Sequence, residues 1–120
     1  MIEKQLVAIF MADAAVQAIA GARIYPMRRP QDDPAPCVVY QRISTAPVKN
    51  IEGDSGLDSV RLQVSCWATA YADAKALAAA VRSAINASGL KSATEMEMDD
   101  QDAETHEFRV MTDYRIWQHL

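Results

Sequence analysis

The sequence has few of the residues that hold small proteins together by covalent bonds or metals. Only two of its 120 residues are cysteines, Cys37 and Cys66, and only two are histidines, His106 and His119. Their spacing matches no structural zinc site, and each cysteine lies in an apolar run typical of a strand. In a reducing compartment such cysteines act as small buried hydrophobic residues. We therefore expect no metal, no cofactor and no disulfide.

Long apolar runs are also missing. Half of the residues are apolar, but charged residues interrupt them every few positions, so no stretch reaches the roughly 20 residues that a membrane helix needs. Residues 1–6 carry an acid beside a lysine and do not resemble a signal peptide. We expect a protein without membrane association that is made and stays in the cytosol.

An excess of positive charge is absent as well. The formal net charge is −4 and the isoelectric point is near 5.0. Non-specific affinity for nucleic acid is built from clustered Lys and Arg, so DNA is not expected to be a specific ligand. A protein past which DNA moves without being bound remains compatible with this charge.

Motifs that carry catalysis are missing too. The chain contains no glycine-rich phosphate loop, no nucleophile elbow and no His-Glu-x-x-His motif. Cys66 and the distant His106 could be drawn as a nucleophile and its base, but Cys66 falls on the apolar face of a predicted strand. A buried, inert thiol is the better interpretation. We predict that the protein is not an enzyme and has no catalytic residues.

The N-terminal third predicts helices followed by a loop. Apolar residues at helical spacing over 2–11 indicate an amphipathic helix. Asp13 can cap a second short helical segment, and Gly21 is suited to end it in a left-handed conformation, which predicts a bent helix or a helical hairpin. Four of the five prolines fall within 26–36, where we expect a loop.

The middle of the chain predicts two strands. The run 37–45 is rich in β-branched and aromatic residues and predicts a strand that Pro47 closes. Residues 46–56 combine glycines with polar groups, which indicates a long, mobile loop. Clean alternation over 57–67 predicts the second strand, with Val60, Leu62, Val64 and Cys66 toward the core.

The last part predicts a helix and two more strands. Thr69 can cap a helix whose apolar stripe runs to Ile85 and which ends at 86–89. The runs 90–98 and 105–117 predict the final strands.

With a short strand at 24–25, the predicted order is helix, short strand, strand, strand, helix, strand, strand. This order indicates one domain spanning 1–120. Its predicted class is α+β, with an antiparallel or mixed sheet of four to five strands and two helices packed on one face.

An acidic segment stands out near the C-terminus. It contains seven acids and no Lys or Arg: Glu95, Glu97, Asp99, Asp100, Asp102, Glu104 and Glu107. A solvated hairpin tip that discourages edge-to-edge aggregation is the plainest interpretation. A divalent-cation site is a weaker one, because the segment lacks the glycine and the spacing of a calcium loop. An acidic surface that faces a DNA channel or a basic partner is the third.

Two further features concern surfaces. Arg28 and Arg29 form a small basic cluster, but two aspartates at 32–33 follow closely, which favours a solvated loop. Trp67 and Trp117 fall on the less apolar faces of their strands. With Met111 they either cover each other across the sheet or form an exposed patch that marks an interface.

Several stretches, taken in order, resemble the bacteriophage and prophage tail-completion family, whose small proteins are related to tail terminators. They are ADAA at 12–15, GARIYP at 21–26, PCVVYQRIS at 36–44, GDSGLDSVRLQVSCW at 53–67, YADAKAL at 71–77 and RVMTDYRIW at 109–117. The resemblance covers nearly the whole chain, and its specificity comes from the ordered set. Residues 90–105 show no clear match.

The resemblance implies a structural subunit of the virion neck. Such a subunit forms a ring, expected to be a hexamer, that caps the tail tube at its head-proximal end and docks to the head connector or stopper protein. The implied partners are further copies of the chain, the tail tube protein and the connector, while DNA passes through the ring. We expect Lys49, Ile51 and Asp54 to contact a neighbouring subunit or the tube, with Trp67 and Trp117 as further interface residues.

Two alternatives stay open at this point. The chain could be another neck connector or a minor tail component, which shares the logic of assembly but meets different partners. It could also be a small-molecule-binding α+β domain, which would need a polar cleft that the sequence does not announce.

Overall fold

The computed structural model describes residues 1–31, 33–50 and 53–119. Its elements are α1 (Ile2–Ala12), α2 (Ala14–Ile19), β1 (Ile24–Pro26), β2 (Cys37–Asn50), β3 (Gly53–Ala68), α3 (Tyr71–Ala87), β4 (Lys91–Gln101) and β5 (Phe108–His119). The predicted order of helices and strands is confirmed. None of the helices in these ranges is long and apolar enough to cross a membrane.

The N-terminal helical segment is divided into α1 and α2 by Asp13. This residue has an extended backbone (φ −86°, ψ 121°), and its side chain accepts a hydrogen bond of 3.0 Å from the Val16 amide. Gly21, at φ +59°, ends the turn after α2 in the left-handed region, which glycine adopts without steric cost. The predicted bend is therefore confirmed, but it makes three helices in total where two were expected.

Helix α3 begins differently from the prediction. Its N-cap is Ala70, which offers no side-chain hydrogen bond, so Thr69 does not cap the helix. Packing stabilises α3 instead: Leu77, Val81 and Ile85 are buried along one face. Tertiary burial of an amphipathic face commonly outweighs capping in this way.

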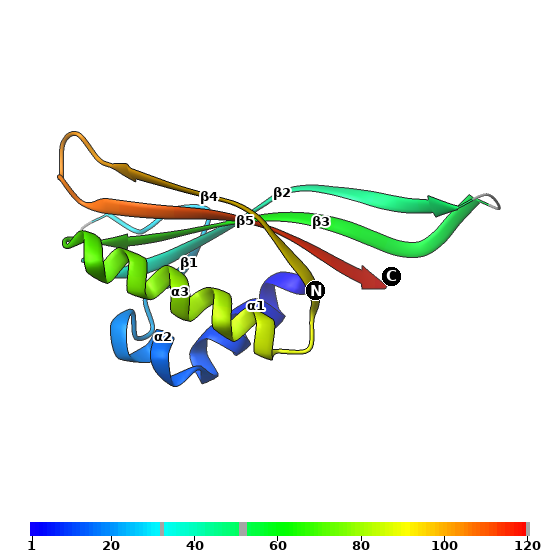
Figure 1. Cartoon of the computed structure of the whole chain (residues 1–120), viewed down its shortest axis with the longest axis horizontal. Helices are drawn as coiled ribbons and strands as arrows, with labels where there is room; N and C mark the ends of the chain where they lie inside the picture. Colours follow the sequence, from blue (N-terminus) through cyan, green and yellow to red (C-terminus); the bar gives the residue numbers. More distant parts are fainter. Residues whose placement is uncertain (32, 51–52, 120) are drawn as a thin grey trace.

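The strands form one five-stranded sheet in the order β1-β2-β3-β5-β4. β1 pairs with β2 in parallel, and all other neighbours are antiparallel, so the sheet is mixed. All three helices lie on the same face of this sheet (Figure 1). The predicted α+β class is thereby confirmed.

The core lies between the helices and this sheet face. Alternating residues of β3, among them Leu62 and Val64, point inward with Val110, Tyr114 and Ile116 of β5. Helix α1 contributes fully buried apolar side chains of its own: Ile2, Leu6 and Phe10. The predicted inward face of 57–67 is confirmed.

Residues 46–56 were predicted to be a loop, and this prediction is wrong for the described part. β2 runs on to Asn50 and β3 starts at Gly53, with cross-strand pairs from Ser44↔Arg61 to Asn50↔Gly53. Pro47 does not end the strand, because β1 covers the outer edge of β2 only at 38–40 and an open edge tolerates a residue without an amide hydrogen.

The paired residues 44–50 and 53–61 form a projection that we call the arm. It extends beyond the helices at one end of the molecule, whose longest dimension is 51 Å against 29 and 23 Å for the others (Figure 1). β5 runs beside the base of the arm as far as the pair Leu57↔His119. Ile51 lies outside the described residues.

Candidate interaction surface

The face of the sheet opposite the helices is the candidate surface. Because side chains alternate along a strand, this face receives the residues between the core positions. On β3 they are Ser59, Arg61, Gln63, Ser65 and Trp67, and on β5 they are Arg109, Met111, Asp113, Arg115 and Trp117. The face therefore combines aromatic, Met and Arg side chains, which are the types enriched in protein interfaces.

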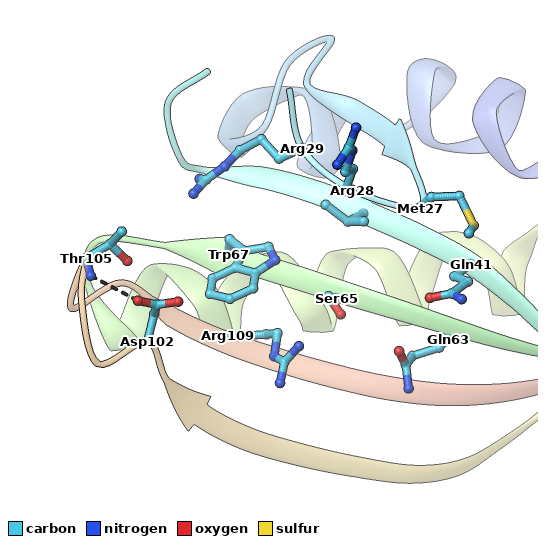
Figure 2. Close-up of a pocket in the computed structure, with 11 residues that line it drawn as sticks. Met27, Arg28, Arg29, Gln41, Gln63, Ser65, Trp67, Asp102, Thr105 and Arg109 are labelled. Carbon is cyan, nitrogen blue, oxygen red and sulfur yellow. Dashed lines mark hydrogen bonds between the residues drawn. The ribbon is translucent and has the colours of Figure 1, made fainter. Parts of the chain in front are cut away.

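A cavity of about 330 Å³ opens at the end of this face that lies away from the arm. Its floor is formed by β2, β3 and β5, and its walls are the segment after β1 and the β4–β5 turn (Figure 2). The lining residues are Met27, Arg28, Arg29, Val39, Gln41, Gln63, Ser65, Trp67, Asp102, Thr105 and Arg109. We call this cavity the Trp67 pocket.

Trp67 is held between two guanidinium groups. The Arg29 Cζ lies 5.9 Å from the centre of the Trp67 ring, and the Arg109 Cζ lies 5.2 Å from it. Both distances fall in the range of cation–π attraction. Arg109 is itself fixed by a two-pronged ion pair with Asp100. The half-buried indole is therefore an ordered platform.

Arg29 joins the two walls of the pocket. Its guanidinium donates to Glu107 at 2.9 and 2.6 Å, across a sequence separation of 78 residues. Hydrogen bonding from Arg29 is the main cause of a lowered pKa at the Glu107 carboxyl group. This fork-like geometry orients both partners more tightly than a single contact would.

Arg28 has a different role from Arg29. Its side chain is exposed, and no acid within 1–31, 33–50 or 53–119 pairs with it. Asp33, the described one of the two aspartates that follow this cluster, accepts a 2.5 Å hydrogen bond from Tyr25 and forms no ion pair with Arg28. Asp32 lies outside the described residues. Arg28 is thus available to an acid from another molecule.

Polar residues in the centre of the open face are bonded to one another. Arg61 donates to Asp113 at 2.9 Å, and Arg115 donates to Ser59 at 2.7 Å. The second carboxylate oxygen of Asp113 is buried and has no hydrogen-bond partner. A buried carboxylate oxygen without a partner costs free energy, which the ion pair with Arg61 offsets in part.

The acidic segment is mostly strand. β4 extends to Gln101, and the turn that follows has Asp102 accepting from the amides of Glu104 and Thr105 at 2.8 and 2.9 Å. The other acids mostly pair with bases: Glu95 with Arg115, Glu97 and Asp99 with Lys75, Asp100 with Arg109, and Glu107 with Arg29. These acids are nevertheless mostly exposed on the edge strand β4 and the β4–β5 turn, as the interpretation of a solvated hairpin expects, and distant strands and a helix supply bases that the sequence did not indicate.

No group of three or more potential metal ligands occurs among the described residues. Cys66 is buried on the core side, and burial raises the pKa of its thiol well above the usual range. Such a thiol is a poor nucleophile. His106 lies in the exposed β4–β5 turn with φ +61° and forms no contact with Cys66. The geometry offers no nucleophile–base pair here.

The residues predicted as interface positions fall in different places. Trp67 lies in the pocket, whereas Trp117 pairs with Ser59 and Lys91 about eight residues, or roughly 27 Å, farther along the sheet. The two tryptophans therefore do not cover each other. Lys49 and Asp54 are cross-strand partners in the arm.

The sequence reasoning missed Arg28, Arg29 and Arg109 as a group. Each looks like an ordinary surface residue in its own segment. Only the folding of the segment after β1 over the open face brings the first two to Trp67 and Arg109 (Figure 2). No local pattern signals a contact across 78 residues.

Comparison with known proteins agrees with this fold. A chain from the virion of a native gene transfer agent particle superposes with a TM-score of 0.72 at 20% identity, covering 96% of this chain and 92% of that one. At this identity the likeness supports the fold alone. No curated protein matches the sequence.

The open face carries an aromatic and arginine platform of the composition found at protein interfaces. The family model of Tail completion protein gp17 matches residues 4–119, and the chain belongs to that family. It is accordingly a structural protein of a phage tail.

Proposed function

We propose that this chain is a ring-forming tail terminator. A ring of its copies, six by our expectation, caps the tail tube at the head-proximal end and docks to the head connector. DNA passes through the ring without specific binding, and the protein carries out no chemistry.

The arm is the observation that carries this proposal. At its base Val60 is buried in the core and β5 flanks β3 as far as Leu57, but farther out the arm projects past the helical layer as two strands that no helix covers (Figure 1). Thr45, Ala46 and Pro47 are exposed there in a paired, extended conformation. A two-stranded projection of this kind gains little stability from its own burial and is suited to a contact with another subunit.

The charges of the chain support a passive role toward DNA. The net charge is −4, and five of the arginines, Arg29, Arg42, Arg61, Arg109 and Arg115, are engaged by acids of the same chain. A surface whose cations are already paired releases few counterions on meeting phosphate and therefore binds it weakly.

The ring is tested by the solution mass across a concentration series, with negative-stain imaging of the heaviest species. Six subunits of 13.2 kDa give about 79 kDa. Closed rings with a central hole wide enough for duplex DNA, roughly 20 Å, are expected. A monomer at every concentration, both alone and with purified tail tubes, contradicts the proposal.

Deletion of residues 48–54 tests the arm. It leaves the pair Pro47↔Asp58 joined by residues 55–57, a three-residue connection that contains the left-handed Gly56. The unfolding midpoint and circular dichroism should stay near those of the intact chain, while rings and the joining of heads to tails are lost. Normal joining by the shortened protein would count against a role of the arm in assembly.

A further inference from the structure

We propose that the arm of one subunit docks into the Trp67 pocket of the next, with acidic residues of the arm meeting Arg28. This inference rests on the proposed ring and names the contact that builds it. The occupant of the pocket is thus a second copy of this chain.

The two surfaces lie at opposite ends of the molecule. The arm forms one end of the 51 Å long axis, and the β4–β5 turn that borders the pocket lies at the other (Figure 1). A contact between two different patches is heterologous: each subunit uses its arm on one neighbour and its pocket on the other. Head-to-tail contacts of this kind close into rings when the rotation per subunit permits.

The pocket offers three recognition features for such a tip. Trp67 supplies a flat apolar platform fixed by Arg29 and Arg109. Gln41 and Gln63 are cross-strand partners on the floor, and their amides can both donate to and accept from an extended backbone. Arg28 adds an exposed cation that forms no ion pair with a described acid, since Asp102, the acid of the lining, accepts hydrogen bonds from the amides of Glu104 and Thr105 instead.

The arm tip has the complementary charge. Residues 49–58 contain three acids, at 52, 54 and 58, against the single base Lys49. Asp58 is half-buried, and its carboxylate forms no ion pair within the described ranges. A net negative tip and an unpaired arginine favour the heterologous contact over a tip-to-tip contact, where like charges repel.

Cysteine cross-linking in the full chain tests the contact. Thr105→Cys places a thiol on the pocket wall, and Ser55→Cys places one at the arm tip, without removing any charge used in the proposal. Both native thiols are buried and should not react with a short bismaleimide. The matched control is Ser83→Cys, an exposed position on α3, which covers the opposite sheet face.

We expect a mixture of Thr105→Cys and Ser55→Cys proteins to give covalent dimers at least tenfold more abundant than the mixture of Ser83→Cys and Ser55→Cys. A chain with both Thr105→Cys and Ser55→Cys should give a ladder on a denaturing gel whose last band counts the subunits of the ring. Equal yields with the control, in solution and in purified tails, overturn the docking. Linking of the pocket thiol to the tail tube protein instead of a second copy also overturns it.

Charge reversal provides an independent measurement. Arg28→Glu should lower the cross-linking yield about tenfold, and adding Asp54→Lys to the same chain should restore it, because the restored pair has the opposite polarity. Misfolding cannot explain a rescue. No loss with Arg28→Glu, or a loss without rescue, overturns the assigned charge contact.

The outcomes separate this inference from the proposed ring. Closed rings without selective linking overturn the docking and leave the ring standing. Selective linking in open chains alone supports the docking and contradicts a closed terminator.

Discussion

The ion pair between Arg29 and Glu107 offers a direct test of how the pocket is held together. The two side chains are 23% and 13% exposed, and they join the segment after β1 to the β4–β5 turn through two hydrogen bonds of 2.9 and 2.6 Å. We consider Arg29→Ala, Glu107→Gln and the double variant. Each single change leaves the other group partly buried without its partner.

The expected magnitude follows from this partial burial. Exposed ion pairs contribute about 0.2–1 kcal/mol, whereas breaking a fully buried pair costs about 3–5 kcal/mol. Arg29→Ala also loses the contact with Trp67, which is worth roughly 0.5–1 kcal/mol at a partly exposed site. We expect losses of about 2 kcal/mol for Arg29→Ala, about 1.5 kcal/mol for Glu107→Gln and about 2.5 kcal/mol for both changes, hence a coupling of about 1 kcal/mol.

Urea unfolding followed by tryptophan fluorescence measures these free energies. The control is the pair of Arg115 and Glu95, whose side chains are 37% and 40% exposed. Its coupling should stay below about 0.5 kcal/mol, as for other exposed pairs. If the coupling between Arg29 and Glu107 is no larger than that of the control pair, the argument from burial and two-pronged geometry is refuted.

The pH dependence gives the same pair a second signature. Arg29 lowers the pKa of Glu107 in the folded protein below its usual 4.5, so the unfolded chain binds the proton more readily. The stabilisation is therefore complete above about pH 5 and declines as the pH falls through the lowered value. The difference in free energy of unfolding between wild type and Glu107→Gln should stay constant from pH 7 to pH 5. It should then become smaller as the pH falls below 4.5, the usual pKa of a glutamate.

Two further predictions concern the core and the first helical bend. Leu62→Ala removes a fully buried side chain beneath α3 and should cost about 3 kcal/mol, a fall of roughly 12 °C in Tm by calorimetry; a fall under about 4 °C would contradict the assigned core. Asp13→Ala removes the acceptor of the Val16 amide hydrogen bond and should lower the free energy of unfolding in urea by about 1 kcal/mol. Asp13→Asn keeps an acceptor at this position and should preserve most of that stability.

The sequence predicted the elements whose signals are local. Strict alternation predicted that Leu62 and Val64 lie on the core side of β3. The N-cap preference of aspartate predicted the bend at Asp13, and the left-handed preference of glycine predicted the turn at Gly21. These features depend on side chains within a few residues of one another, so a single sequence carries them.

The pocket could not be predicted in the same way. It depends on where the segment after β1 crosses the open face, and that path is fixed by Arg29 meeting Glu107, 78 residues away. The ion pairs of the acidic segment were not predicted for the same reason. Its acids have no base within the segment, while Lys75 of α3 and Arg115 of β5 reach them only after folding.

The arm shows a conflict between local composition and the sheet. Glycines, Pro47 and polar side chains over 46–56 favour a loop, yet the described part is paired strand, and the pairing continues outward past the core through register shifts after Arg42 and after Val48. Little apolar burial rewards the outer part of that extension within one subunit, and in the proposed docking a neighbouring subunit supplies the missing burial. If the proposed docking is correct, the arm is fully stabilised only in the assembled ring, so amide hydrogen exchange in the arm should be slower in the ring than in the monomer.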